Sequence, residues 1–273
     1  MSNCKDSKSA CLRFGAMSDI HLYRKPYRLV SALRMLREID VLLLAGDLAD
    51  RGTAEQYAIL ESVLETHLKD IPIFIVSGNH DLQLNDDENF RMFERKIRDR
   101  LMDRYQVDDD PSGAYSVRLN EYVDLVGLNP LYTQKIFRFS DRGRQLAYLE
   151  DCLKNSPCPN HIVLCHPPLA AHNPQQSRPY LPKEQDAKLQ QIIHEHPHTL
   201  FLSGHTHLYP TIEYDGYGNI YINDGSICPT QKKETGDNVD SGNVMFFEVT
   251  NSFVNPRFEM IKNSAKTVRS VEK

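Results

Sequence analysis

Five apolar runs in this chain each end in a short polar turn that carries aspartate, asparagine or histidine, and this repetition constrains its fold most strongly. The clearest run is 73–81, which reads Ile-Phe-Ile-Val-Ser-Gly-Asn-His-Asp. Its β-branched and aromatic residues predict a short buried strand, and Ser77-Gly78 ends that strand before three polar side chains. The other runs are 12–18, 41–45, 161–165 and 199–203. Strands of this kind bring chemically active side chains to one edge of a sheet.

Helices are predicted between these strands. In 27–39 the apolar residues recur with the spacing of one buried helical face. Thr53 and Gln56 predict a capping box at the start of a helix that runs to about residue 68. Further helices are predicted within 86–104, 142–153 and 183–194. The alternation of strand and helix up to residue 128 favours a largely parallel sheet.

The remaining strands have shorter connections. A strand pair is predicted over 115–117 and 122–128, and closing antiparallel strands over 211–214, 220–223 and 244–249. We therefore expect an α/β fold with two packed mixed β-sheets flanked by helices.

One domain is expected over 1–273, with disordered tails at 1–10 and about 262–273, and with fraying from residue 251 onwards. The long loop 167–182 is predicted to be functional, and 86–104 to cover the rim of the site.

Composition excludes several classes of protein. The apolar runs are far too short to cross a bilayer, and no apolar stretch of signal-peptide length opens the chain, so we expect a cytoplasmic protein. The net charge of -5 argues against a general nucleic-acid-binding protein, which needs a basic face. No C-x-x-C pair is present, which suits reduced thiols rather than a cysteine zinc site; the cysteines are Cys4, Cys11, Cys152, Cys158, Cys165 and Cys228.

Seven polar side chains follow predicted strands and form a candidate metal site. They are Asp19, His21, Asp47, Asn79, His166, His205 and His207. In open α/β sheets the ligand site lies at the carboxyl ends of the strands, so these side chains could gather in one crevice. Oxygen donors combined with imidazoles suit divalent Mn, Fe, Zn or Co. Seven ligands are too many for one ion, whereas two ions that share a bridging carboxylate use them all, and paired metals suit displacement at phosphorus.

The same residues resemble a known family. Five blocks occur in the order Asp-x-His, Gly-Asp, Gly-Asn-His-Asp, His after a strand, and Gly-His-x-His, between Asp19 and His207. This order is similar to that of the calcineurin-like metallophosphoesterase superfamily. The resemblance covers most of the chain and implies an αββα metallophosphoesterase sandwich with a binuclear metal centre.

The resemblance also implies which residue binds which ion. It places Asp19, His21 and His207 on one metal. It places Asn79, His166 and His205 on the other, with Asp47 as the bridge and with Asn79 also facing the substrate. In the family the histidine of the Gly-Asn-His block is not a ligand but faces the phosphate, which makes His80 the predicted proton donor or transition-state contact.

Three further residues are candidates for the site. Asp50 and Arg51 lie in a Gly-Asp-x-x-Asp-Arg-Gly string similar to that of the protein phosphatases, where the aspartate orients the catalytic histidine and the arginine grips phosphate. Asp81 stands where those phosphatases carry glutamate, which disfavours that branch. His172, on the loop 167–182, is a candidate for substrate binding, although a solvated surface role is the simpler account.

The segment 52–57 looks more like that of the class III cyclic-nucleotide phosphodiesterases. This resemblance implies a phosphoesterase that hydrolyses a small phosphodiester, such as a cyclic nucleotide, by attack of a metal-bound hydroxide at phosphorus. The alternatives are a phosphomonoesterase or a protein phosphatase on the same bimetal site, and a less favoured one is a non-catalytic metal-binding scaffold. A DNA repair nuclease would need a basic surface. The expected partner is a small phosphoester, with no membrane and no nucleic acid; metal identity, natural substrate and oligomeric state stay open.

Overall fold

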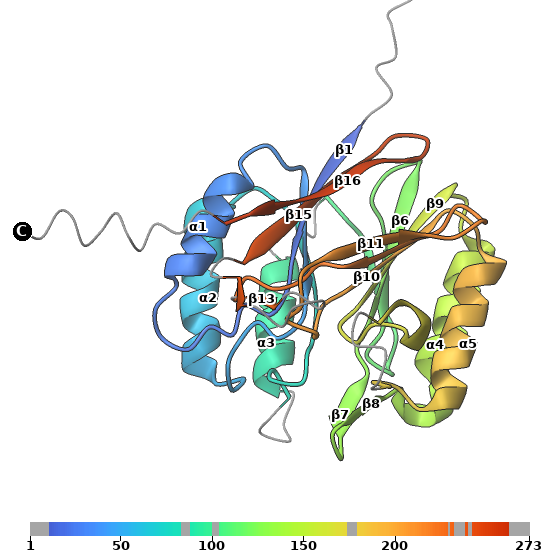
Figure 1. The fold of residues 1–273 in the computed structure, drawn as a ribbon, viewed down its shortest axis with the longest axis horizontal. Helices are drawn as coiled ribbons and strands as arrows, with labels where there is room; N and C mark the ends of the chain where they lie inside the picture. The colour runs from blue at the N-terminus through green and yellow to red at the C-terminus, as the bar shows by residue number, and fades with distance from the viewer. Residues whose placement is uncertain are drawn as a thin grey trace, which may run out of the picture.

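The computed structural model describes residues 11–82, 88–99, 104–173, 179–228, 230–231, 238–239 and 242–261. Two large β-sheets lie against each other, and helices cover their outer faces, so the layers run helix, sheet, sheet, helix (Figure 1). Helices α1, α2 and α3 lie on one side and α4 and α5 on the other. This is the fold class that the strand and helix pattern predicts.

The first sheet has five strands in the order β16-β15-β1-β2-β3. Their bounds are β1 Leu12–Met17, β2 Val41–Ala45, β3 Ile73–Val76, β15 Asn243–Val249 and β16 Phe253–Met260. Strands β1, β2 and β3 run parallel, while β15 is antiparallel to β1 and β16 to β15. The covering helices are α1 Tyr27–Met35, α2 Ala54–His67 and α3 Glu88–Asp99. The predicted capping box of Thr53 and Gln56 starts α2.

The second sheet has seven strands in the order β11-β12-β10-β9-β6-β5-β4. Their bounds are β4 Val107–Asp109, β5 Tyr115–Arg118, β6 Val123–Leu128, β9 Asn160–Cys165, β10 Thr199–Ser203, β11 Thr211–Tyr214 and β12 Ile220–Asn223. Strands β6, β9, β10 and β12 are parallel. The covering helices are α4 Ser140–Asn155 and α5 Lys183–Glu195. Minor elements are β7 Leu131–Thr133 paired with β8 Ile136–Arg138, β13 Thr230–Gln231 paired with β14 Asn238–Val239, and the short 3-10 helix η1 Ala170–His172.

Three apolar layers hold this sandwich together. The layer between the sheets includes Phe14 and Phe247, whose rings stack with centroids 4.8 Å apart. One outer layer packs the first sheet against α1, α2 and α3, and the other packs the second sheet against α4 and α5. Every residue of β2 is buried because both faces of its sheet are covered, which explains why 41–45 reads as a continuous apolar run.

Of two expectations about the later strands, one holds only in part and the other is wrong. The strand 220–223 is not purely antiparallel, since β12 pairs parallel to β10 with Leu200 opposite Ile220 and antiparallel only to β11. The chain after residue 251 does not fray at once, because 253–260 adds the edge strand β16 to β15. The predicted tails 1–10 and 262–273 lie outside the described residues.

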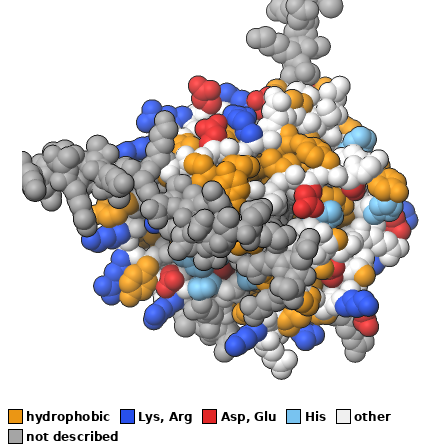
Figure 2. All heavy atoms as spheres, viewed as in Figure 1, with side chains coloured by type: hydrophobic (Ala, Val, Ile, Leu, Met, Phe, Trp, Pro, Cys, Tyr) orange, Lys and Arg blue, Asp and Glu red, His pale blue; other side chains and the backbone are white. Residues whose placement is uncertain are grey.

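The two sheets also meet at their edge strands. Hydrophobic side chains gather over β15, β16 and the neighbouring β11 on the face shown in Figure 2. Phe258 of β16 packs edge-on against Tyr209, just before β11, with ring centroids 5.2 Å apart. In the described part of the chain, no helix is both long and apolar enough to span a bilayer.

Candidate metal centre

Each of the predicted ligand residues lies just after the carboxyl end of a strand. Asp19 and His21 follow β1, Asp47 follows β2 and Asn79 follows β3, whereas His166 follows β9 and His205 and His207 follow β10. Two cross-strand contacts join these turns, since Gly204 N donates to His166 O over 3.0 Å and His205 N donates to Asp19 Oδ2 over 2.9 Å. The turns of both sheets therefore meet at one place, as predicted.

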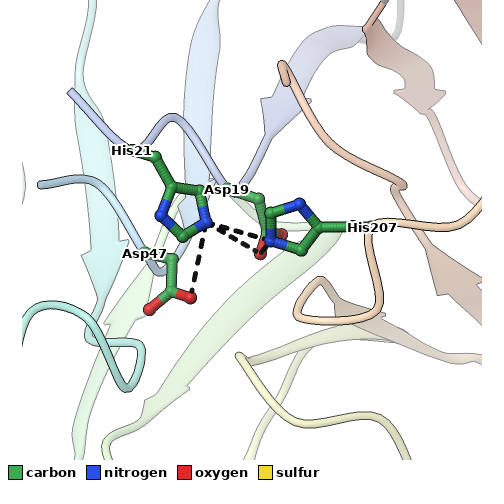
Figure 3. Close-up of side chains that lie close together, drawn as sticks. All are labelled: Asp19, His21, Asp47 and His207. Carbon is green, nitrogen blue, oxygen red and sulfur yellow. Dashed lines mark hydrogen bonds and ion pairs between the residues drawn. The ribbon is translucent and has the colours of Figure 1, made fainter. Parts of the chain in front are cut away.

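Four side chains form the first donor group, which Figure 3 shows converging from the turns after β1, β2 and β10. The group consists of Asp19, His21, Asp47 and His207, with one donor atom from each within 4.8 Å of the others. Asp19 Oδ1 lies 3.1 Å from His207 Nε2 and 3.8 Å from His21 Nε2. Asp47 Oδ2 lies 3.7 Å from His21 Nε2. Two carboxylates and two imidazoles at these separations suit a divalent cation.

The second donor group shares Asp47 with the first. It consists of Asp47, His166 and His205. His166 Nδ1 donates to the carbonyl of Ala45 over 2.6 Å, so the lone pair of the neutral ring is on Nε2, which lies 3.4 Å from Asp47 Oδ2. A carbonyl that fixes the tautomer in this way is the usual support for a metal-binding histidine. Asp47 is thus placed where a bridging carboxylate belongs.

Buried polar atoms test whether these residues fit metal ions. Among the described residues, Asn79 Oδ1 and His166 Nε2 are buried and have no hydrogen-bond partner. Such atoms are rare in folded proteins and call for an explanation. Asn79 sits between Gly78, which packs on Asp47, and His80, whose amide N donates to Asp47 Oδ1 over 2.7 Å. The donor set therefore fits two divalent metal ions.

The charges of the donors also suit cations. Burial raises the pKa of Asp19, but the neighbouring rings of His207 and His21 outweigh it and hold that pKa well below its usual value. Burial lowers the pKa of His166, yet the negative charge of Asp47 prevails and raises it to about 9. Burial lowers the pKa of His205 to about 3. The site thus holds ionised carboxylates beside a neutral imidazole, and a metal ion would displace the proton of His166.

The backbone at the centre is strained. Five of the predicted ligand residues have positive φ, namely Asp19 (50°), His21 (43°), Asp47 (52°), His205 (72°) and His207 (52°). Residues other than glycine rarely adopt this left-handed conformation, which costs roughly 1–2 kcal/mol each. Strain of this kind clusters at functional sites, where the surrounding structure enforces it. It turns each side chain back toward the centre within two to four residues of the strand end.

This strain predicts an inverted stability order at His207. Because alanine resists a positive φ and glycine does not, His207→Gly is expected to be more stable than His207→Ala by about 1 kcal/mol in urea unfolding of the metal-free protein. Glu65, exposed within α2, is the matched control, since there the glycine variant should be the less stable by about 1 kcal/mol. If the alanine variant were the more stable one at both positions, the backbone at His207 would not be strained.

Two glycines let neighbouring turns approach closely. A Cβ on Gly78 would lie 2.7 Å from Asp47 Cγ, and a Cβ on Gly204 would lie 2.6 Å from Asp19 Oδ2. Both distances are far below normal contact. The glycines of the Gly-Asn-His and Gly-His-x-His blocks are therefore required by close packing against predicted ligands that follow other strands.

The predicted proton donor His80 lies beside the first donor group. Its ring packs edge-on against His21 with centroids 4.3 Å apart, and donor atoms of His21, Asp50 and His80 lie within 4.8 Å of one another. His80 Nδ1 donates to the backbone carbonyl of Asp50 over 2.8 Å. Asp50 thus orients the ring through its backbone. Arg51, with 65% of its side chain exposed, lies 3.6 Å from the Asp50 carboxylate.

His172 is held by other residues. Its ring stacks on Tyr221 with centroids 3.6 Å apart, and its Nδ1 lies 2.7 Å from Glu213 Oε2. These contacts hold the imidazole ring of His172 against β11 and β12. Its role in substrate binding stays a prediction.

Asp81 is a structural residue of the site whose role sequence reasoning missed. Its buried carboxylate accepts from Leu48 N at 3.2 Å, Ala49 N at 3.1 Å and Gly78 N at 2.9 Å. It also accepts from the hydroxyl of Tyr57 in α2 at 2.8 Å. One carboxylate therefore joins the turn after β2 to the turn after β3.

Asp81→Ala is expected to destabilise the fold by about 3 kcal/mol or more, because it leaves three buried amides and a hydroxyl without an acceptor. Urea unfolding of the metal-free protein measures this loss. Asp151→Ala, at an exposed position of α4, should change stability by less than about 0.5 kcal/mol. A loss below about 1 kcal/mol at Asp81 would refute its role.

Ser18 and Asp224 were also missed. The hydroxyl of Ser18 contacts Asp19 Oδ2 and donates to Asp224 Oδ1 over 2.5 Å. Burial raises the pKa of Asp224 well above its usual value. Asp224 follows β12, whose parallel pairing with β10 brings its carboxyl end to the metal centre. A signal was present, because 220–223 is another apolar run that ends in polar residues.

Comparison with known proteins places this geometry in a family. The sequence model described as Calcineurin-like phosphoesterase matches residues 12–209. The chain belongs to the calcineurin-like phosphoesterase family. The match covers every predicted ligand, from Asp19 to His207, and confirms the resemblance carried by the five blocks.

Several members of the calcineurin-like family resemble this chain at low identity. A 3',5'-cyclic-nucleotide phosphodiesterase of Nostoc sp. is 29% identical over 172 residues, covering 62% of this chain and 56% of the relative. A probable glycerophosphodiester phosphodiesterase of Arcobacter nitrofigilis is 25% identical over 157 residues, covering 56% of this chain and 51% of the relative. The chain spans about half the length of these relatives.

Solved structures confirm the fold. A dimetal phosphatase from Danio rerio superposes with a TM-score of 0.60 at 13% identity, covering 92% of this chain and 99% of that one. The purple acid phosphatase of yellow lupin superposes with a TM-score of 0.63 at 13% identity, covering 94% of this chain and 52% of that one. At such identities the likeness concerns the fold.

Proposed function

We propose that this protein is a bimetal phosphodiesterase that hydrolyses a small phosphodiester such as a cyclic nucleotide. The observation that carries the proposal is the pair of donor groups that share Asp47, in a chain of the calcineurin-like family. The phosphodiesterase names of the sequence relatives favour a diester over a monoester. Asp19, His21 and His207 bind one ion in this proposal, and Asn79, His166 and His205 the other.

Two divalent cations, when bound, supply positive charge that stabilises the negative charge developing on the phosphoryl group. His80 supplies the proton that the departing oxygen needs. Because its Nδ1–H is held by the carbonyl of Asp50, the transferable proton of the imidazolium is on Nε2. Asn79 and Arg51 contact the phosphate in this arrangement. The exposed guanidinium of Arg51 can reach a ligand without first leaving a buried ion pair.

The protein loaded with Mn²⁺, Zn²⁺, Co²⁺ or Fe²⁺ tests the proposal on matched substrates. Bis(4-nitrophenyl) phosphate, a 3',5'-cyclic nucleotide and a glycerophosphodiester represent diesters, and 4-nitrophenyl phosphate represents monoesters. Faster turnover of at least one diester, with about two ions per chain, supports the assignment. Faster turnover of the monoester would favour a phosphomonoesterase, and two bound ions without any turnover would favour the scaffold. Location in the cytoplasm and a single domain over 1–273 stay predictions.

A further inference from the structure

Strand β3 forms an edge of the first sheet, and side chains from the second sheet bind the backbone of this edge. The hydroxyl of Tyr115, in β5, donates to the carbonyl of Ile75 over 2.9 Å. Two residues further along, Ser77 N donates to Asn129 Oδ1 over 2.7 Å, and Ser77 Oγ donates to the same oxygen over 3.1 Å. Residues two apart in a strand direct their backbone groups to the same side, so both contacts lie along one edge.

Asn129 follows β6, and its side-chain amide and its backbone N and O all make hydrogen bonds. Its Nδ2 donates to the carbonyl of Gly113 over 2.9 Å. Its backbone N donates to Gln145 Oε1, and Gln145 Nε2 donates back to the carbonyls of Asn129 and Ser112, all three at 2.9 Å. Asn129 and Gln145 are 1% and 0% exposed. Buried amides with all these bonds made leave little freedom to the backbone that they hold.

The backbone held by Asn129 leads directly into the Gly-Asn-His block. Ser77 precedes Gly78, whose amide N is bound by Asp81, and then come Asn79 and His80. Consecutive amides are thus bound by two side chains from different parts of the fold. A shift of about 1 Å at such a position can cost about 10²-fold in rate even when the altered residue is remote from the chemistry.

We infer that Asn129 is a positioning residue for Asn79 and His80, held in place by Gln145. This inference rests on the proposed function for the roles of Asn79 and His80. The Oδ1 atom of Asn129 binds Ser77 and so fixes the position at which the turn after β3 begins. Removing that atom displaces one predicted metal ligand and the predicted proton donor together.

Asn129→Leu tests the inference through two readouts. The affinity for one of the two ions, measured by titrating Zn²⁺ into the metal-free protein, is expected to fall about 10–100-fold. The kcat for a cyclic nucleotide is expected to fall about 10²-fold per folded molecule, with KM little changed. Asn129→Asp keeps an oxygen that accepts from Ser77 N while losing the donor to Gly113, so it should regain part of both losses and provides a milder variant if the leucine variant folds poorly.

Two control variants separate positioning from plain stability. Asn219→Leu makes the same change at a fully buried asparagine that binds Thr199 N at the amino end of β10, far along the strands from the metal centre. Tyr115→Phe removes the other contact to the edge of β3. Both should lower the unfolding midpoint and leave metal affinity and kcat per folded molecule unchanged.

Unchanged affinity for both ions in Asn129→Leu would overturn the inference, as would an equal loss in Asn219→Leu. A different result would refute the proposed function: the wild-type protein would bind two ions and hydrolyse no diester. The metal titration would still decide the role of Asn129 in that case.

Discussion

Asp47→Ala is expected to abolish binding of both metal ions and to lower turnover about 10³-fold or more, since one carboxylate serves both donor groups. Its Oδ2 lies 3.7 Å from His21 Nε2 and 3.4 Å from His166 Nε2, and among the described residues Asp47 is the carboxylate that belongs to both donor groups. Metal content per chain, measured beside hydrolysis of bis(4-nitrophenyl) phosphate, checks the result.

Asp47→Asn is the matched variant for this experiment. Asparagine tolerates the positive φ of position 47 and keeps an oxygen for the amide N of His80, while it removes the negative charge. Its metal loss should therefore approach that of the alanine variant, with a smaller loss of stability. Retention of two tightly bound ions by either variant would refute the bridging role.

His80→Ala is expected to keep both ions and to lose about 10²–10⁴-fold in turnover of diesters with a poor leaving group, the usual size of general acid catalysis. The metals should stay because the contact to Asp47 comes from the backbone amide of His80, which any side-chain substitution preserves. In the proposed mechanism Nε2 donates the proton, since Nδ1 is bound to the carbonyl of Asp50.

Two substrates separate proton donation from phosphate binding at His80. A 4-nitrophenyl diester departs readily as an anion, whereas a ribose or alkyl oxygen needs a proton, so the loss should be much smaller for the former. Equal losses would make His80 a charge contact to the phosphate instead. His67→Ala, at the exposed end of α2, controls for removal of a histidine and should leave both rates unchanged. Wild-type rates in His80→Ala would exclude both roles.

Local patterns in the sequence were sufficient to predict most of the fold. The bounds of β2, β10, β11 and β12 agree with the predicted runs, and α2 begins at the predicted capping box. Strands β2, β10 and β12 are buried and mostly apolar, and glycine and polar residues mark their ends. The gathering of Asp19, His21, Asp47, His166, His205 and His207 also follows, because parallel strands place their carboxyl ends together.

Residues that depend on long-range pairing could not be predicted in the same way. Asp224 was missed because 220–223 was interpreted only as a closing antiparallel strand, whereas β12 also pairs parallel to β10. Asn129 was missed because 122–128 was considered only as the partner of 115–117, although β6 also pairs parallel to β9. The contact between His80 and Asp50 uses a backbone carbonyl, which residue identity does not encode.

The proposed ligands come from two separate sheets: Asp19, His21, Asp47 and Asn79 follow strands of the first sheet, and His166, His205 and His207 follow strands of the second. Bound ions would therefore cross-link halves of the molecule that otherwise adhere through apolar contact and a few hydrogen bonds, such as that from Tyr115 to Ile75. A ligand that binds only the folded state adds about 1.4 kcal/mol of stability for each tenfold rise in its free concentration above Kd. The free metal concentration would then govern how often the two halves separate. Because proteases cleave the separated state, a cell short of metal would degrade the protein faster.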